Sequence, residues 1–171
     1  IPAVYGEILS PGATRTLVFY AHYDGQPVNP AKWAEGLSPF KPQLATAALD
    51  KGGKFLDLPP ANSPLNDDWR LYGRATADDK AGVFTILNAY DAIRRSGLNP
   101  GINLKFFFEG EEERGSTNLG AILAANKDLL KADAWIIVDG PMHASGRKQI
   151  TFGVRGDVNM NLTVFGAKRP L

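Results

Sequence analysis

The stretch INLKFFFEGEEERGS, residues 102–116, decides the fold because it runs from a hydrophobic segment directly into a cluster of acids. Its apolar residues end in three consecutive phenylalanines, which predicts a strand over residues 102–108. Carboxylates this close repel one another by about 1 kcal/mol per pair even in water. Their position where the strand ends favours a functional site, with a solvated loop as the plainer alternative.

On either side of this stretch, strand patterns alternate with helix patterns. Apolar runs at residues 16–21 and 134–138 predict two more buried strands, and residues 4–9 predict another. Apolar residues at helical spacing predict helices over residues 81–95 and about 117–131. This order of elements predicts an α/β fold: a three-layer sandwich around a central mixed, largely parallel sheet.

Two further parts of the chain show weaker patterns. Residues 28–68 hold most of the prolines and little periodicity, which predicts a long surface excursion with one short helix around residues 31–36. Residues 149–153 and 157–165 resemble two strands, and the second alternates as if one face of its sheet were exposed.

Composition limits the classes of partner and ligand. At 171 residues, with 44% hydrophobic and 22% charged residues, the chain is long enough for one globular domain with a sizeable core. Its formal net charge is +1 and its basic residues are scattered, so neither nucleic acid nor a membrane is an expected partner. No signal peptide is visible, which predicts a cytoplasmic location unless the N-terminus is truncated. The chain has no cysteine, which leaves imidazole and carboxylate as its strong metal ligands.

Metal-capable side chains follow three of the predicted strands and open the first predicted helix. They are His22, Asp24, Asp78, Asp79, Glu112, Glu113 and Asp139. If the strands are parallel, their carboxyl ends meet at one edge of the sheet, where ligands bind in folds of this kind. So much negative charge is costly without a cation. The sequence therefore predicts one or two divalent ions at this edge, zinc in preference to cobalt or manganese.

Each of these groups taken singly has a plainer interpretation. His22 is the type of side chain that is often simply hydrogen-bonded, although Asp24 is well placed to orient it. Asp78 and Asp79 together fit a helix cap, and Asp139 before Gly-Pro fits a turn. It is their coincidence at strand ends and a helix start that favours one shared site.

The segments AHYD, GRATADDKAG, EGEEERGS and VDGP occur in that order between Ala21 and Pro141. Together they resemble the M20 metallopeptidases, a family that includes glutamate carboxypeptidases, carnosinase-type dipeptidases, aminoacylases and succinyl-diaminopimelate desuccinylase. The resemblance implies a zinc-exopeptidase-like catalytic domain over residues 1–153. It also implies that residues 154–171 begin a lid domain, mostly absent here, through which family members often form homodimers.

The resemblance also implies a role for each candidate residue. His22 and Asp139 would bind one metal ion, and Asp24 would orient His22. Asp78 would bridge two zinc ions, Glu113 would bind the second ion, and Glu112 would be the general base. Glu109 and Glu111 would be supporting or solvent-facing acids.

The activity implied is metal-dependent hydrolysis of the amide bond in small peptides, as by a dipeptidase or carboxypeptidase. Two alternatives stay open: deacylation of N-acyl amino acids, and non-catalytic binding of metal or peptide. The second arises because nothing in the chain matches the family's final metal-binding histidine. The family also usually has glycine where this chain has Ala75 and Ala81, and alanine there strains the loop if the backbone needs a positive φ.

Overall fold

The computed structural model describes residues 3–143, 145–154, 156, 158 and 160–166. The chain divides into two compact units, Ile1–Gly140 and Pro141–Leu171. Within the described residues, none of the helices has the length and apolar character needed to cross a membrane.

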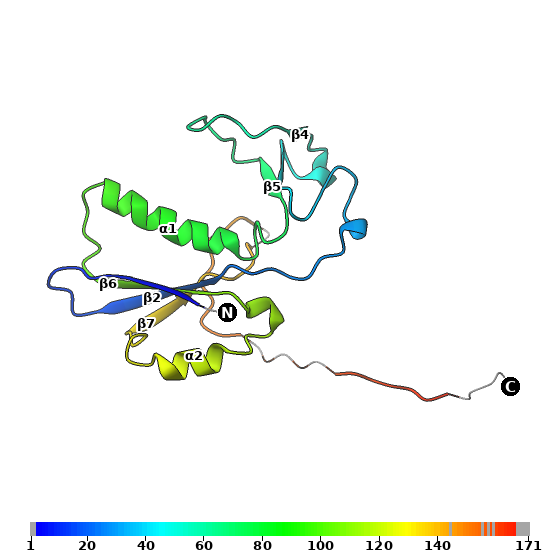
Figure 1. The fold of residues 1–171 in the computed structure, drawn as a ribbon. Helices are drawn as coiled ribbons and strands as arrows, with labels where there is room; N and C mark the ends of the chain where they lie inside the picture. Colours follow the sequence, from blue (N-terminus) through cyan, green and yellow to red (C-terminus); the bar gives the residue numbers. More distant parts are fainter. Residues whose placement is uncertain (1–2, 144, 155, 157, 159, 167–171) are drawn as a thin grey trace. The chain divides into compact units, whose positions relative to one another are not determined.

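The first unit contains a four-stranded sheet in the order β1-β6-β2-β7 (Figure 1). Its strands are β1 (Val4–Ile8), β2 (Thr16–His22), β6 (Asn103–Glu109) and β7 (Ala134–Ile137). β2 runs parallel to both β6 and β7, whereas β1 is antiparallel to β6. The predicted mixed, largely parallel sheet is therefore confirmed, and the carboxyl ends of β2, β6 and β7 lie at one edge.

Helices α1 (Lys80–Arg95) and α2 (Leu119–Ala125) cover opposite faces of this sheet (Figure 1). The α1 face buries a cluster that includes Ile86 with Phe106 and Phe108, whereas Phe107 belongs to the cluster on the α2 face. Because successive side chains of a strand point to opposite faces, three consecutive phenylalanines fill both layers of core. The three-layer α/β sandwich is confirmed.

The second helix is shorter than the periodicity predicted. It ends at Ala125 instead of continuing to about residue 131. The side-chain amide of Asn126 donates to the carbonyl of Ile122 at 2.9 Å, the carbonyl that also accepts the backbone N–H of Asn126. Such competition by a short polar side chain is typical of residues that end helices. Leu130 is still buried in the α2-side core, so the apolar spacing reflected packing and not a continuous helix.

The excursion after β2 contains structure that the sequence did not indicate. Strands β4 (Phe55–Leu56), β3 (Gln43–Ala45) and β5 (Arg70–Tyr72) form a second, antiparallel sheet. The predicted helix around residues 31–36 is a 3-10 helix at Pro30–Lys32. Strands of two or three residues are too short to show a period of two, which is why this sheet was missed.

The two strands predicted after residue 148 are not found. The described residues of 149–153 and 157–165 form no strand, and Asp157 and Asn159 lie outside the described residues. The apolar side chains there are exposed, by 99% at Phe152 and 90% at Leu162. A strand needs a pairing partner and a surface to bury, and the alternation of residues supplies neither. The predicted boundary between residues 153 and 154 stays a prediction.

Candidate metal centre

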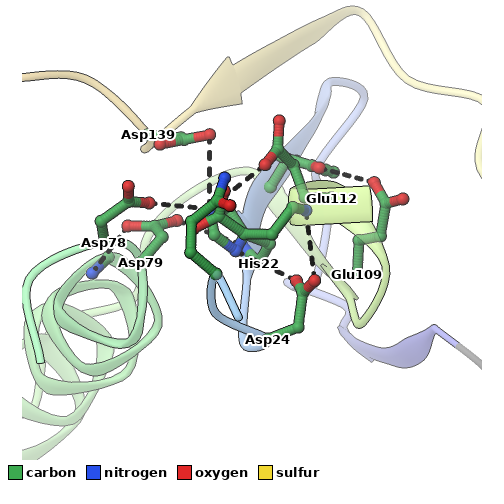
Figure 2. Close-up of polar contacts among 11 residues, drawn as sticks. His22, Asp24, Asp78, Asp79, Glu109, Glu112 and Asp139 are labelled. Carbon is green, nitrogen blue, oxygen red and sulfur yellow. Dashed lines mark hydrogen bonds and ion pairs between the residues drawn. The ribbon is translucent and has the colours of Figure 1, made fainter. Parts of the chain in front are cut away.

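His22 stands at the end of β2 and is fully buried. Its Nδ1 lies 3.2 Å from Oδ1 of Asp24, while its Nε2 lies 3.0 Å from Oδ1 of Asp78 (Figure 2). The same Nε2 lies 3.7 Å from Asp139 and 3.8 Å from Glu112. Nδ1 of His22 is held by Asp24 and its Nε2 faces three carboxylates, which is the orientation of a metal-binding imidazole.

The candidate ligands form two overlapping groups around this nitrogen. His22, Asp78 and Glu113 offer ligand atoms within 4.8 Å of one another, and so do His22, Asp79 and Asp139. The structure thus brings His22 together with the other three predicted ligands, although the four come from β2, the start of α1 and the segments after β6 and β7. Their role as ligands stays a prediction.

Asp79 joins the site for a different reason. It is the N-cap of α1, and its Oδ1 accepts the backbone N–H of Gly82 at 3.2 Å. Its Oδ2 accepts the backbone N–H of His22 at 3.1 Å, so the buried carboxylate ties the helix start to the end of β2. The helix-cap interpretation therefore accounts for Asp79, and the adjacent Asp78 is left with a side chain that is 66% exposed.

Two residues of the loop after β2 contact Glu113. The backbone N–H of Glu113 donates to Oδ2 of Asp24 at 3.1 Å, so Asp24 contacts both His22 and Glu113. The side-chain amide of Gln26 donates to Oε2 of Glu113 at 2.5 Å. Gln26 was not predicted as a site residue, because a neutral amide gives no signal of charge or metal ligation. Its only clue in the sequence is its place two residues after Asp24.

Glu112 opens the 3-10 helix Glu112–Arg114, and its side chain is 38% exposed. Burial raises the pKa of Glu112 above its usual value; His22 opposes this shift, and the negative charge of Asp139 adds to it. A carboxylate with a raised pKa that still reaches solvent suits the transfer of a proton near neutral pH. The position of Glu112 is compatible with the predicted role of general base, and that role stays a prediction.

Tyr20 of β2 and Glu109 of β6 form a buried pair. The hydroxyl of Tyr20 donates to Oε2 of Glu109 at 2.6 Å, and Glu109 is only 2% exposed (Figure 2). Burial and this carboxylate both raise the pKa of Tyr20, so its proton stays on the hydroxyl. Of the two predicted roles, Glu109 takes the supporting one and does not face solvent. Glu111 accepts two hydrogen bonds from the amide of Asn118.

The charges of the site favour a cation. Burial raises the pKa of Asp139, and the acids Asp78 and Glu113 add to that shift. Burial lowers the pKa of His22, but the surrounding carboxylates outweigh it and raise the net value. In addition, Oε1 of Glu113 is buried and has no hydrogen-bond partner among the described residues. One imidazole, several acids and an unpartnered buried carboxylate oxygen fit a divalent ion such as zinc.

In the segment that leads from β5 into α1, the backbone strain predicted for alanine is found at Ala75 but not at Ala81. Ala75 is buried with φ of 61°, in the left-handed region that glycine adopts without cost. Ala81 instead lies in the first turn of α1. The substitution of alanine for glycine is therefore strained at position 75 and compatible with helix at position 81.

Residues 18–170 match the sequence profile of peptidase family M20/M25/M40. The chain belongs to the M20 peptidase family. It is 30% identical over 172 residues to a Cys-Gly metallodipeptidase of Schizosaccharomyces pombe, covering 99% of this chain and 32% of that protein. It is also 30% identical over 158 residues to the Beta-Ala-His dipeptidase of Homo sapiens, covering 91% of this chain and 27% of that protein.

Solved structures agree with this assignment. An M20 family metallo-carboxypeptidase from Sulfolobus solfataricus superposes with a TM-score of 0.62 at 33% sequence identity, over 85% of this chain and 28% of that one. The chain thus spans 27–32% of the length of these relatives. M20 metallopeptidases use divalent metal ions, and the residues gathered around His22 fit one.

Proposed function

We propose that the complete protein is a metal-dependent hydrolase that cleaves the amide bond of small peptides, as a dipeptidase or a carboxypeptidase does. The observation that carries this proposal is the convergence on Nε2 of His22 of acids from three separate segments. The relatives described above support it, since they are dipeptidases and a carboxypeptidase. Their names favour peptides over N-acyl amino acids as substrates.

The proposal assigns a metal-binding role to four residues. His22 and Asp139 would hold one zinc ion, Glu113 would hold a second, and Asp78 would be shared by both. Bound there, such ions polarise the scissile carbonyl and lower the pKa of water near them. Cobalt or manganese would suit the same ligands.

The remaining steps belong to side chains of this chain. Asp24 accepts the proton on Nδ1 of His22 in a hydrogen bond and so keeps Nε2 directed at the site. As the oxygen of the attacking water bonds to the carbonyl carbon, Glu112 takes a proton from that water. As the C–N bond breaks, Glu112 passes that proton to the leaving nitrogen. Both proton transfers use the same partly exposed carboxylate, so no second acid is required.

The domain organisation is proposed on the family resemblance alone. Residues 1–153 would belong to the catalytic domain and residues 154–171 would begin the lid domain. The complete protein would form homodimers through that lid and act in the cytoplasm. Size-exclusion chromatography with light scattering on the complete protein tests the dimer directly.

The decisive experiment compares the complete wild-type protein with its Glu112→Gln variant. General-base catalysis contributes roughly 10²–10⁴-fold, so we expect turnover to fall by about that factor while bound zinc, counted by elemental analysis, is unchanged. Dipeptides tested beside N-acetyl and N-succinyl amino acids would identify the substrate class. Wild-type protein that binds no divalent ion would overturn the proposed function, whereas normal turnover in the variant would remove Glu112 from the base role.

A further inference from the structure

The loop that follows β2 contacts Glu113 at both its backbone and its side chain. Asp24 accepts the backbone N–H of Glu113, and the amide of Gln26 donates to Oε2 of the same residue. These two contacts join residues that are 87 and 89 positions apart in the sequence. The other carboxylate oxygen of Glu113, Oε1, is buried and has no hydrogen-bond partner in the described part of the chain.

We propose that Gln26 is a positioning residue for Glu113, whose amide engages Oε2 and leaves Oε1 as the atom that binds the cation. The inference rests on the proposed function, because it takes Glu113 to be a metal ligand. Asp24 fixes the backbone of Glu113 and Gln26 fixes the carboxylate, so two bonds from one loop define both the place and the orientation of the ligand.

An uncharged donor suits this position better than a cationic one. A carboxylate that can rotate offers either oxygen, and holding one of them in a hydrogen bond preselects the other. A lysine or arginine would do the same but would bring a positive charge next to the cation. Gln26 orients Glu113 without reducing the negative charge that Glu113, Asp78 and Asp139 bring to the site.

The position of Gln26 also makes the inference testable without unfolding the protein. Gln26 is exposed, so removing its amide creates no buried cavity. Gln26→Met keeps an unbranched side chain of similar length and removes the donor. Asn118→Leu is the matched control, because the amide of Asn118 donates to Glu111, an acid that is not a predicted ligand.

The first measurement is metal affinity in the complete protein, by titration of the metal-free form with Zn2+ and by the visible absorption of bound Co2+. Loss of a residue that orients a ligand typically weakens metal binding by roughly 10–100-fold, and we expect that range for Gln26→Met. We expect Asn118→Leu to stay within about threefold of wild type, because its partner binds no metal. The thermal midpoint of metal-free Gln26→Met should equal that of wild type.

A double-mutant cycle with Glu113→Gln separates positioning from a merely structural role. If Gln26 acts through Glu113, adding Gln26→Met to Glu113→Gln should weaken Zn2+ binding by less than about threefold further. Fully additive losses would overturn the inference, and so would a Gln26→Met variant that binds as tightly as wild type. Wild-type protein that binds neither ion would overturn the proposed function and this inference with it.

Discussion

The four-stranded sheet and the three-stranded sheet of the first unit are built in opposite ways. The larger sheet buries side chains on both faces, including Phe106 beneath helix α1 and Phe107 beneath helix α2. The smaller sheet buries only Leu44 and Ala45 among its described strand residues and leaves Phe55 42% exposed. Catalytic geometry needs rigid support. The candidate metal centre accordingly lies at the edge of the sheet that has two layers of core.

The largest difference between the two sheets is expected when a phenylalanine side chain is removed from each of them. Phe107→Ala should lower the free energy of unfolding by about 3–5 kcal/mol, because a fully buried ring leaves a cavity and its contacts are lost. Phe55→Ala should cost less than half as much, since Phe55 is half exposed already. Urea unfolding of the two complete variants measures both values. Equal costs would mean that the smaller sheet has a core of comparable importance.

A pair of tyrosines makes the corresponding comparison for polar contacts. Tyr20→Phe leaves Oε2 of the buried Glu109 without its donor, and we expect a loss of about 1–3 kcal/mol in unfolding free energy. In the smaller sheet, the hydroxyl of Tyr72 accepts the backbone N–H of Leu49 at 2.9 Å in a partly buried place. Tyr72→Phe should cost less than about 1 kcal/mol, because this contact is only partly buried. Thermal unfolding that ranks the variants in the reverse order would contradict this assignment.

The sequence predicted the larger sheet and its edge because their patterns are strong. Apolar runs mark β2 and β7, three consecutive phenylalanines mark β6, and an acid or histidine follows each of these runs. The smaller sheet escaped prediction because its strands hold two or three residues each. Spacing alone also could not separate Asp78 from Asp79, since only the backbone donors of His22 and Gly82 identify Asp79 as the cap.

Long-range contacts set the remaining limit on prediction. Gln26 and Glu113 are 87 positions apart, and nothing in the pattern of either segment indicates that they meet. The end of α2 at Ala125 differs, because the side-chain bond of Asn126 there is a local one, to the carbonyl of Ile122. Periodicity reports which side chains are buried, whereas the partner of each polar group depends on how the elements pack.

A smaller change in the free energy of unfolding is expected from the segment that joins β5 to α1. Ala75→Gly should raise the free energy of unfolding by up to about 1 kcal/mol. The substitution removes the cost of a left-handed alanine, about 1–2 kcal/mol. Part of this gain is offset, because glycine gives the unfolded chain more conformational entropy. Ala81→Gly is the control, and should instead destabilise α1 by up to about 1 kcal/mol. Two shifts of the same sign in urea unfolding would contradict the strain at Ala75.

The smallest expected effect concerns pH and depends on the charges that gather only at the edge of the larger sheet. Burial raises the pKa values of Asp79, Glu112 and Asp139, and the surrounding carboxylates raise that of His22 despite its burial. All four groups therefore hold more protons in the folded metal-free protein than in the unfolded chain. For the three acids, the difference in bound protons appears as pH rises above their ordinary pKa values near 4, and the stability that they contribute is lost as pH rises further. The stability that His22 contributes is complete below its ordinary pKa near 6.5 and is lost as pH rises through the raised value.

Both signs agree, so the thermal midpoint of the chelator-treated protein should fall as pH rises from about 5 to 8. With excess Zn2+ the trend should weaken or reverse, because the ion competes with protons for the same groups and binds better as they deprotonate. Differential scanning fluorimetry in matched buffers measures both series. A midpoint that rises with pH in chelator would mean that the acids around His22 are not held together in the metal-free protein. The edge of the larger sheet would then take its form from the cation, and the two layers of core beneath it would support the site only once metal is bound.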